Sequence, residues 1–303
     1  MTETYTVDKI TPEEFSGRWS SEELSEANAW IISILSQPDN KFAPTYSKTQ
    51  LLAMLDSHPH AARIFQDVLL LEKPQTGTES PIEIFADVPP DAAFAEIQQA
   101  YVGADGKYRQ PNTKFMPRHT YSDLLSLQAN CNQYIVEQIS IRNWPERPGI
   151  IIDSGYRSPS YQAITLLRAI VEYGLGDALK RCSVPGSSQH SDYRHPAVDF
   201  MIIGDQFGKL LLNPQTGYRD NVASFEQSLE FEALLKFGPD CGYWLPYHPN
   251  PDNPLSTISH AGIIYEPWHW QYLGNPEEAH RRMVENQVYE SIAARKQALA
   301  KVA

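Results

Sequence analysis

The sequence predicts an α+β protein in which a small sheet is flanked by helices and preceded by a mainly helical N-terminal extension. Amphipathic stretches at 21–36 and 48–71 read as helices, and residues 119–142 carry apolar side chains at helical spacing. Short apolar runs next to turn residues, at 149–153 and 197–203, are typical of core strands. This mixture of long helical patterns and short strand patterns favours the α+β class.

The remaining elements follow from the same patterns. The first predicted strand is followed by a turn at 154–159 and a helix at 160–173. Further along we expect a helix at 224–236, strands at 259–265 and 268–273, and a closing helix at 276–300.

A composition shift suggests two regions. Helix-start signals, Thr-Pro-Glu-Glu at 11–14 and Ser-Lys-Thr-Gln at 47–50, belong to the first region. Between residues 73 and 118 the chain becomes rich in Pro, Gly, Asp and Thr, which marks turns and a linker. We therefore expect a boundary near residue 115, with a mainly helical region of unassigned role at 1–115.

Charge and composition exclude several classes of protein. The 303 residues are 42% hydrophobic, which suits a globular chain with one large or two modest cores. A formal net charge of -12 argues against a nucleic-acid partner, because phosphate binding needs basic patches. The apolar runs are far shorter than the roughly 20 residues of a membrane-spanning helix, so we expect no membrane span.

Two further features concern the compartment and the cysteines. The first ten residues lack the basic and apolar parts of a secretory signal, so a cytoplasmic location is the default expectation. The three cysteines, an odd number without a Cys-x-x-Cys pair, indicate neither a disulfide framework nor a thiolate zinc site.

Asp199 lies in an apolar strand. Alternation places Ala197, Asp199 and Met201 on one face and Val198 and Phe200 on the other. An unpaired carboxylate there would cost several kcal/mol, so Asp199 needs a cation, an arginine or a ring of donors. A divalent metal would meet this need.

Histidines lie on both sides of this strand in the sequence. His190 and His195 precede it, and His269 follows far downstream in Glu-Pro-Trp-His. Two imidazoles and a carboxylate leave a fourth zinc position open, which is typical of catalytic rather than structural sites.

Glu266, three residues before His269, is the candidate general base for water. Residues three apart in a regular strand point to opposite faces, so this pair shares one site only if Pro267 introduces a kink or bulge.

Read together, these motifs resemble the zinc D-Ala-D-Ala peptidases, the VanY-like carboxypeptidases and dipeptidases of the M15 and hedgehog-type fold. The matching segments are Ser-x-His at 188–190, Ala-x-Asp at 197–199, Glu-x-Trp-His at 266–269 and an arginine segment at 154–158. The resemblance covers roughly 149–273. It implies a small antiparallel sheet that carries the zinc site, within a catalytic domain at 116–303.

The resemblance also assigns roles position by position. It implies that zinc is the cofactor and that His190, Asp199 and His269 are its ligands. It implies that Glu266 is the base and that Arg157 stabilises the oxyanion of the tetrahedral intermediate. The residues assigned to substrate binding are Ser188, Arg157, Tyr193 and Trp268.

The sequence departs from the family pattern between the first ligand and Asp199. The usual spacing is seven residues with a glycine in the middle, whereas His190 and Asp199 lie nine apart without one. The inserted stretch, which includes Tyr193, would reshape the substrate pocket, or His195 would replace His190 as the ligand. His190 is preferred because Ser188 keeps its place relative to it.

The resemblance implies hydrolysis of peptidoglycan stem peptides or muropeptides, with D-alanyl-D-alanine carboxypeptidase as the first hypothesis. An L-alanyl-D-glutamate endopeptidase of the endolysin type shares the same metal frame and stays open. A non-catalytic zinc-binding module is the third hypothesis, against which Glu266 and Arg157 both count.

Overall fold

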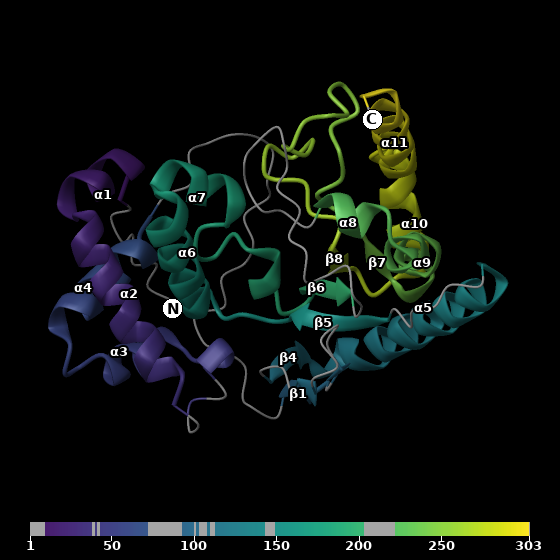
Figure 1. The fold of residues 1–303 in the computed structure, drawn as a ribbon. Coiled ribbons are helices and arrows are strands. Elements are labelled where there is room, and N and C mark those ends of the chain that lie inside the picture. The colour runs from purple at the N-terminus through teal and green to yellow at the C-terminus, as the bar shows by residue number, and fades with distance from the viewer. Residues whose placement is uncertain are drawn as a thin grey trace, which may run out of the picture. The chain divides into compact units, whose positions relative to one another are not determined.

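A computed structural model describes residues 10–37, 40, 43–71, 93–99, 101–102, 108–109, 113–142, 149–202 and 222–302 (Figure 1). These residues combine helices with small antiparallel sheets, which confirms the α+β class. Over this part of the chain, none of the helices is both long and apolar enough to cross a bilayer. Most of the expected linker at 73–118 lies outside the described residues, as does the last residue of the strand expected at 197–203.

The chain divides into two compact units, and the division is discontinuous. The first unit is Met1–Asp91 with Arg157–Asp192, and the second is Ala92–Tyr156 with Tyr193–Ala303. The boundary that we expected near residue 115 therefore does not coincide with a division between compact units. The assignment of separate roles to 1–115 and 116–303 stays a prediction.

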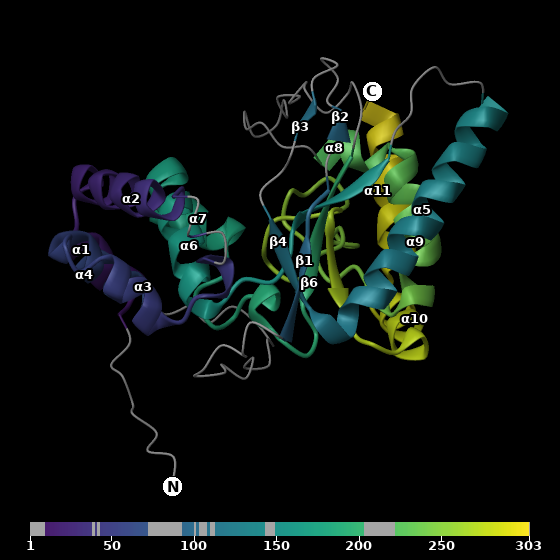
Figure 2. The ribbon, with the colours of Figure 1, turned by 90° about the horizontal axis from the view of Figure 1, so that it is seen from below.

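Helices make up the first unit. They are α1 (Pro12–Arg18), α2 (Ser21–Leu35), α3 (Lys48–Met54), α4 (Pro59–Leu69), α6 (Pro159–Tyr173) and α7 (Leu175–Arg181), with the 3-10 turns η2 (Ala43–Thr45) and η5 (Gln189–Ser191). In the figures, α2, α4 and α6 lie side by side, and their apolar faces share one core (Figures 1 and 2). This core joins the N-terminal helices to α6, which begins 90 residues after the end of α4.

The second unit mixes strands and helices. The strands are β1 (Phe94–Ile97), β2 (Tyr101–Val102), β3 (Tyr108–Arg109), β4 (Lys114–Pro117), β5 (Ile150–Ser154), β6 (Ala197–Ile202), β7 (Tyr243–Trp244) and β8 (His269–Tyr272). The helices are α5 (Tyr121–Arg142), α8 (Val222–Glu226), α9 (Leu229–Phe237), α10 (Pro276–Glu285) and α11 (Val288–Val302), with the 3-10 turns η4 (Arg118–Thr120) and η7 (Pro239–Cys241).

The main sheet of this unit has the strand order β5-β6-β8-β7, and every neighbouring pair is antiparallel. One face of it is apolar: Val198, Phe200, Trp270 and Tyr272 join the core that also contains the buried side of α5 and α9. These two helices pack against each other beside the sheet (Figure 2). The predicted alternation is confirmed, because Asp199 is absent from this core while both its strand neighbours belong to it.

Three segments expected as single helices are each broken in two. In 48–71 the break precedes Pro59, which begins α4 because proline lacks the N–H that a helix interior requires but fits its first turn. Ser228 caps the N-terminus of α9 and separates it from α8. Gln287, with φ 54°, separates α10 from α11.

The prediction of a strand at 259–265 is wrong. The segment forms only isolated bridges, such as Ile258 with Ile264, and Gly262 adopts φ 79° between them. The chain folds back at this left-handed glycine, so the run of Ile and small residues becomes the two arms of a tight loop.

Candidate metal centre

Asp199 and His269 are held opposite each other by the sheet. They are direct register partners in the antiparallel pair of β6 and β8. His269 Nδ1 lies 2.9 Å from Asp199 Oδ1, and the two side chains are 4% and 16% exposed. The backbone pairing of two strands therefore fixes an imidazole and a carboxylate in contact, on the face away from the apolar core.

His190 completes a group of three. It lies in η5 and is buried, three residues before the second unit resumes at Tyr193. His190, Asp199 and His269 each offer one ligand atom, and these atoms all lie within 4.8 Å of one another. Two imidazoles and one carboxylate are the donor set that zinc takes in catalytic sites, with a further position left open. The residues therefore fit the ion that the sequence predicts.

His195, the alternative ligand, is not part of this group. Its side chain is exposed, and its carbonyl accepts a hydrogen bond from Gln271 Nε2 at 3.2 Å. The next residue, Pro196, accepts from the backbone N–H of Tyr272 at 3.0 Å. The end of the inserted stretch is thus anchored to β8 through its backbone.

Glu266 reaches His269 through a turn. The His269 N–H donates to the Glu266 carbonyl at 3.1 Å, which closes a β-turn with Pro267 at its second position, where proline is favoured. Glu266 Oε2 lies 3.8 Å from His269 Nδ1. Trp270 Nε1 donates to the Pro267 carbonyl at 3.1 Å and holds the turn. The kink expected at Pro267 is therefore present, as a turn that precedes β8.

Tyr247 is a further neighbour of the site, outside the residues to which the sequence assigned a role. Its ring stacks on the His269 ring, with centroids 4.7 Å apart and an interplanar angle of 28°. Its carbonyl accepts from the Glu266 N–H at 3.2 Å. The aromatic run at 243–247 is visible in the sequence, but nothing in its spacing points to His269.

Arg157 and His190 are joined through their backbones. The Arg157 N–H donates to the His190 carbonyl at 3.0 Å, so the arginine segment and the first histidine meet within the first unit. Ser188 is 3% exposed, and its carbonyl accepts from the Ser191 N–H at 2.9 Å in the turn that presents His190. This contact places the backbone of Ser188 in the loop that carries His190, and contact of its side chain with substrate stays a prediction.

Tyr193 and Trp268 have packing contacts. Tyr193 lies edge-on to Phe94 at 5.6 Å and donates its hydroxyl to the Ala93 carbonyl at 3.3 Å. Trp268 packs against the core of the second unit, edge-on to Phe225 at 6.2 Å. Their contact with substrate stays a prediction.

Comparison with known families agrees with the motifs. Residues 138–275 match the family model described as VanY, D-alanyl-D-alanine carboxypeptidase. This segment is VanY-like. The predicted family resemblance is confirmed, and the VanY-like segment contains all three residues of the metal-binding group together with Glu266 and Arg157.

Solved structures similar to the chain include three peptidases. The vancomycin-resistance D,D-dipeptidase VanXYg, in complex with a D-Ala-D-Ala phosphinate analogue, is 24% identical over 58% of this chain and 58% of its own, with a TM-score of 0.36. VanYB in complex with D-Ala-D-Ala is 17% identical over 62% and 83%, with a TM-score of 0.36. DacB from Streptococcus pneumoniae D39 is 18% identical over 56% and 72%, with a TM-score of 0.35.

The chain spans just over half the length of VanXYg. A search among curated proteins found no match.

Proposed function

We propose that this chain is a zinc-dependent peptidase that hydrolyses peptidoglycan stem peptides, as a D-alanyl-D-alanine carboxypeptidase. The observation that carries the proposal is the placement of Glu266 beside His269 by a β-turn, next to a three-residue group that suits zinc. The match of the surrounding segment to VanY supports the substrate class.

His190, Asp199 and His269 would hold the zinc ion. When bound, zinc supplies a Lewis acid for the scissile carbonyl and lowers the pKa of water to about 7. Glu266 accepts a proton from water as its oxygen bonds to the carbonyl carbon, and it then passes this proton to the leaving amine as the tetrahedral intermediate collapses and the C–N bond breaks. In the role that the family resemblance implies, Arg157 would supply a guanidinium to the carbonyl oxygen as it becomes negative, which would stabilise the transition state more than the ground state.

The stacked ring of Tyr247 has a supporting role in this mechanism. It covers one face of the His269 imidazole while its backbone carbonyl holds the N–H of Glu266. Tyr247 thereby restrains both the proposed ligand His269 and the proposed base Glu266, which keeps Glu266 correctly placed for proton transfer.

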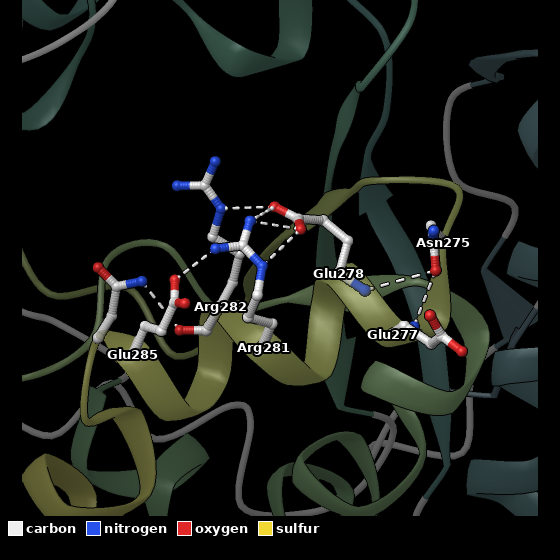
Figure 3. A network of polar contacts seen from close by, with 7 residues as sticks. Asn275, Glu277, Glu278, Arg281, Arg282 and Glu285 are labelled. Carbon is white, nitrogen blue, oxygen red and sulfur yellow. Dashed lines mark hydrogen bonds and ion pairs between the residues drawn. The ribbon is translucent and has the colours of Figure 1, made fainter.

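The first prediction concerns Glu266. Glu266→Gln keeps the size of the side chain but removes the base, so release of D-Ala from a muramyl pentapeptide should fall on the order of 100-fold or more. Mass spectrometry of the products measures this release and names the cleaved bond. The matched control is Glu277→Gln at the exposed start of α10, which should leave turnover unchanged (Figure 3).

Metal dependence is the companion measurement. A chelator should abolish release of D-Ala, and added zinc should restore it in the wild-type chain but not in His269→Ala. Cleavage between L-Ala and D-Glu would replace the carboxypeptidase assignment with the endopeptidase one. Stoichiometric zinc binding without cleavage of any stem peptide would contradict the proposal in favour of a zinc-binding module.

A further inference from the structure

The loop that delivers Glu266 has little regular structure of its own. It consists of two arms, 254–259 and 263–266, joined by the turn at Gly262. The arms are linked by few backbone bonds: the Tyr265 N–H donates to the Thr257 carbonyl at 3.0 Å, and the Ser259 N–H to the Ile263 carbonyl at 2.6 Å. An irregular loop of this kind needs other contacts to fix the residue at its end.

Arg295 provides such contacts from α11. Its Nη1 donates to two carbonyls of the first arm, those of Pro254 at 2.9 Å and Ser256 at 3.0 Å. The guanidinium also lies over the Tyr265 ring, 5.2 Å from its centroid. One side chain therefore holds the first arm through its backbone and touches the residue that directly precedes Glu266.

Glu226 of α8 fixes the guanidinium in turn. Arg295 Nε donates to Glu226 Oε1 at 2.8 Å, and the two side chains are 7% and 3% exposed. Burial raises the pKa of Glu226, and Arg295 beside it acts in the opposite direction. Such a buried pair contributes little net stability, since desolvation offsets the attraction, but it orients both partners.

We propose that Arg295 is a positioning residue for Glu266. The order of contacts is continuous: Arg295 holds the first arm at residues 254 and 256, residue 257 holds the N–H of residue 265, and Glu266 follows. Arg295 lies outside the VanY-like segment, which ends at residue 275. The inference rests on the proposed function only for its effect on turnover; the effect on the loop is independent of it.

Charge alone does not explain these contacts. A lysine at position 295 would keep a positive charge beside Glu226, but it offers a single ammonium group in place of a planar fork that donates in two directions. Arg295→Lys should therefore keep the ion pair with Glu226 but lose the hydrogen bonds to the two loop carbonyls.

The test compares three variants with the wild-type chain. Arg295→Lys should lower kcat for D-Ala release by about tenfold to a hundredfold, with KM and zinc stoichiometry unchanged. The double variant Arg295→Met with Glu226→Leu removes both buried charges together, so its thermal midpoint should stay close to that of the wild type. The kcat of this double variant should be as low as that of Arg295→Lys.

The third variant is a surface control. Arg281 of α10 pairs with Glu278 and Glu285 and is 51% exposed, so Arg281→Met removes an arginine from an ion-pair network without touching the loop (Figure 3). It should leave both kcat and the loop unchanged.

Hydrogen exchange of the peptide covering 254–266 supplies a readout that needs no activity. Exchange in this peptide should become faster in Arg295→Lys and in the double variant, and stay the same in Arg281→Met. Unchanged exchange, or a double variant with wild-type kcat, would overturn the inference. If the wild-type chain cleaves no stem peptide, the proposed function fails while the exchange result still decides whether Arg295 holds the loop.

Discussion

His248 is buried directly after Tyr247 in the sequence. It is 1% exposed, its Nδ1 lies 3.0 Å from the Pro249 carbonyl, and its ring stacks on that of His260 at 3.8 Å. Burial first, and then the neighbouring His260, lower the pKa of His248 from 6.5 to about 4. The folded protein therefore resists protonation at this ring.

This residue predicts a loss of stability in weak acid. Between pH 6.5 and about 4 the unfolded chain binds a proton that the folded chain does not, so stability falls as the pH drops through this window. The full loss from His248 is about 3 kcal/mol. Urea denaturation across this range measures it. His248→Phe should flatten the pH dependence, and a slope equal to that of the wild type would contradict the prediction.

At the same scale, the pairing of Glu266 with His269 was predictable because the two residues are close in sequence, whereas the ligand set His190, Asp199 and His269 followed from the family resemblance. Glu266 and His269 are three residues apart, and a turn with proline at its second position is enough to bring them together. Tyr247 and Arg295 were not predictable in this way. The partner of Arg295, Glu226, lies 69 residues away, and only packing of the whole second unit brings the two into contact.

Among the elements, α6 depends on a single buried cap. The Ser158 hydroxyl accepts from the Tyr161 N–H at 3.0 Å and donates to the Tyr46 carbonyl at 2.7 Å, and the residue is 0% exposed. Ser158 thus caps the start of the helix and links it to the residue that directly follows η2.

Ser158→Ala should destabilise the protein by about 1–3 kcal/mol, because it removes a helix cap and one hydrogen bond to the half-buried Tyr46 carbonyl. Ser20→Ala is the control. Ser20 caps α2 through an exposed capping box, so its loss should cost about 1 kcal/mol or less. Chemical denaturation gives both values, and an equal cost at the two caps would count against a tertiary role for Ser158.

Helix starts were the elements best predicted from sequence. The signals at 11–14 and 47–50 both form capping boxes, in which the side chains of Thr11 and Ser47 accept from the third helical N–H. All donors and acceptors of such a box lie within four consecutive residues. The strand expected at 259–265 failed because composition does not show where a chain turns back, and Gly262 placed the turn inside the apolar run.

For the molecule as a whole, each unit has a hydrophobic core of its own. Ile64, fully buried, belongs to the core of the first unit, and none of the residues in that core occurs in the core of the second. Ile64→Ala should cost about 2–5 kcal/mol through lost contacts and a cavity.

Hydrogen exchange of individual amides shows which of the two units is destabilised. In Ile64→Ala, buried amides of α2, α4 and α6 should exchange faster, while those of α9 and β8 should keep their wild-type rates. Leu234→Ala, in the core of the second unit, should give the reverse pattern. Uniform acceleration in either variant would mean that the two units unfold as one.

Which residues share a core could not be predicted, although the amphipathic helices could. The pattern of α6 shows that Ala163, Ile164, Leu166 and Leu167 need a partner, but not that the partner is the distant N-terminal helical region. The boundary expected near residue 115 rested on the composition shift at 73–118, and composition does not show which helices share a core.

The discontinuous first unit has a consequence for synthesis. Its N-terminal helices leave the ribosome about 90 residues before α6, the element against which they bury their apolar faces. At 5–20 residues per second, roughly 5–20 s pass in which those faces lack the part of this core that α6 supplies. During that interval the nascent chain is exposed to proteases and to other unfinished chains, and a chaperone that binds apolar helices would shield it until α6 emerges.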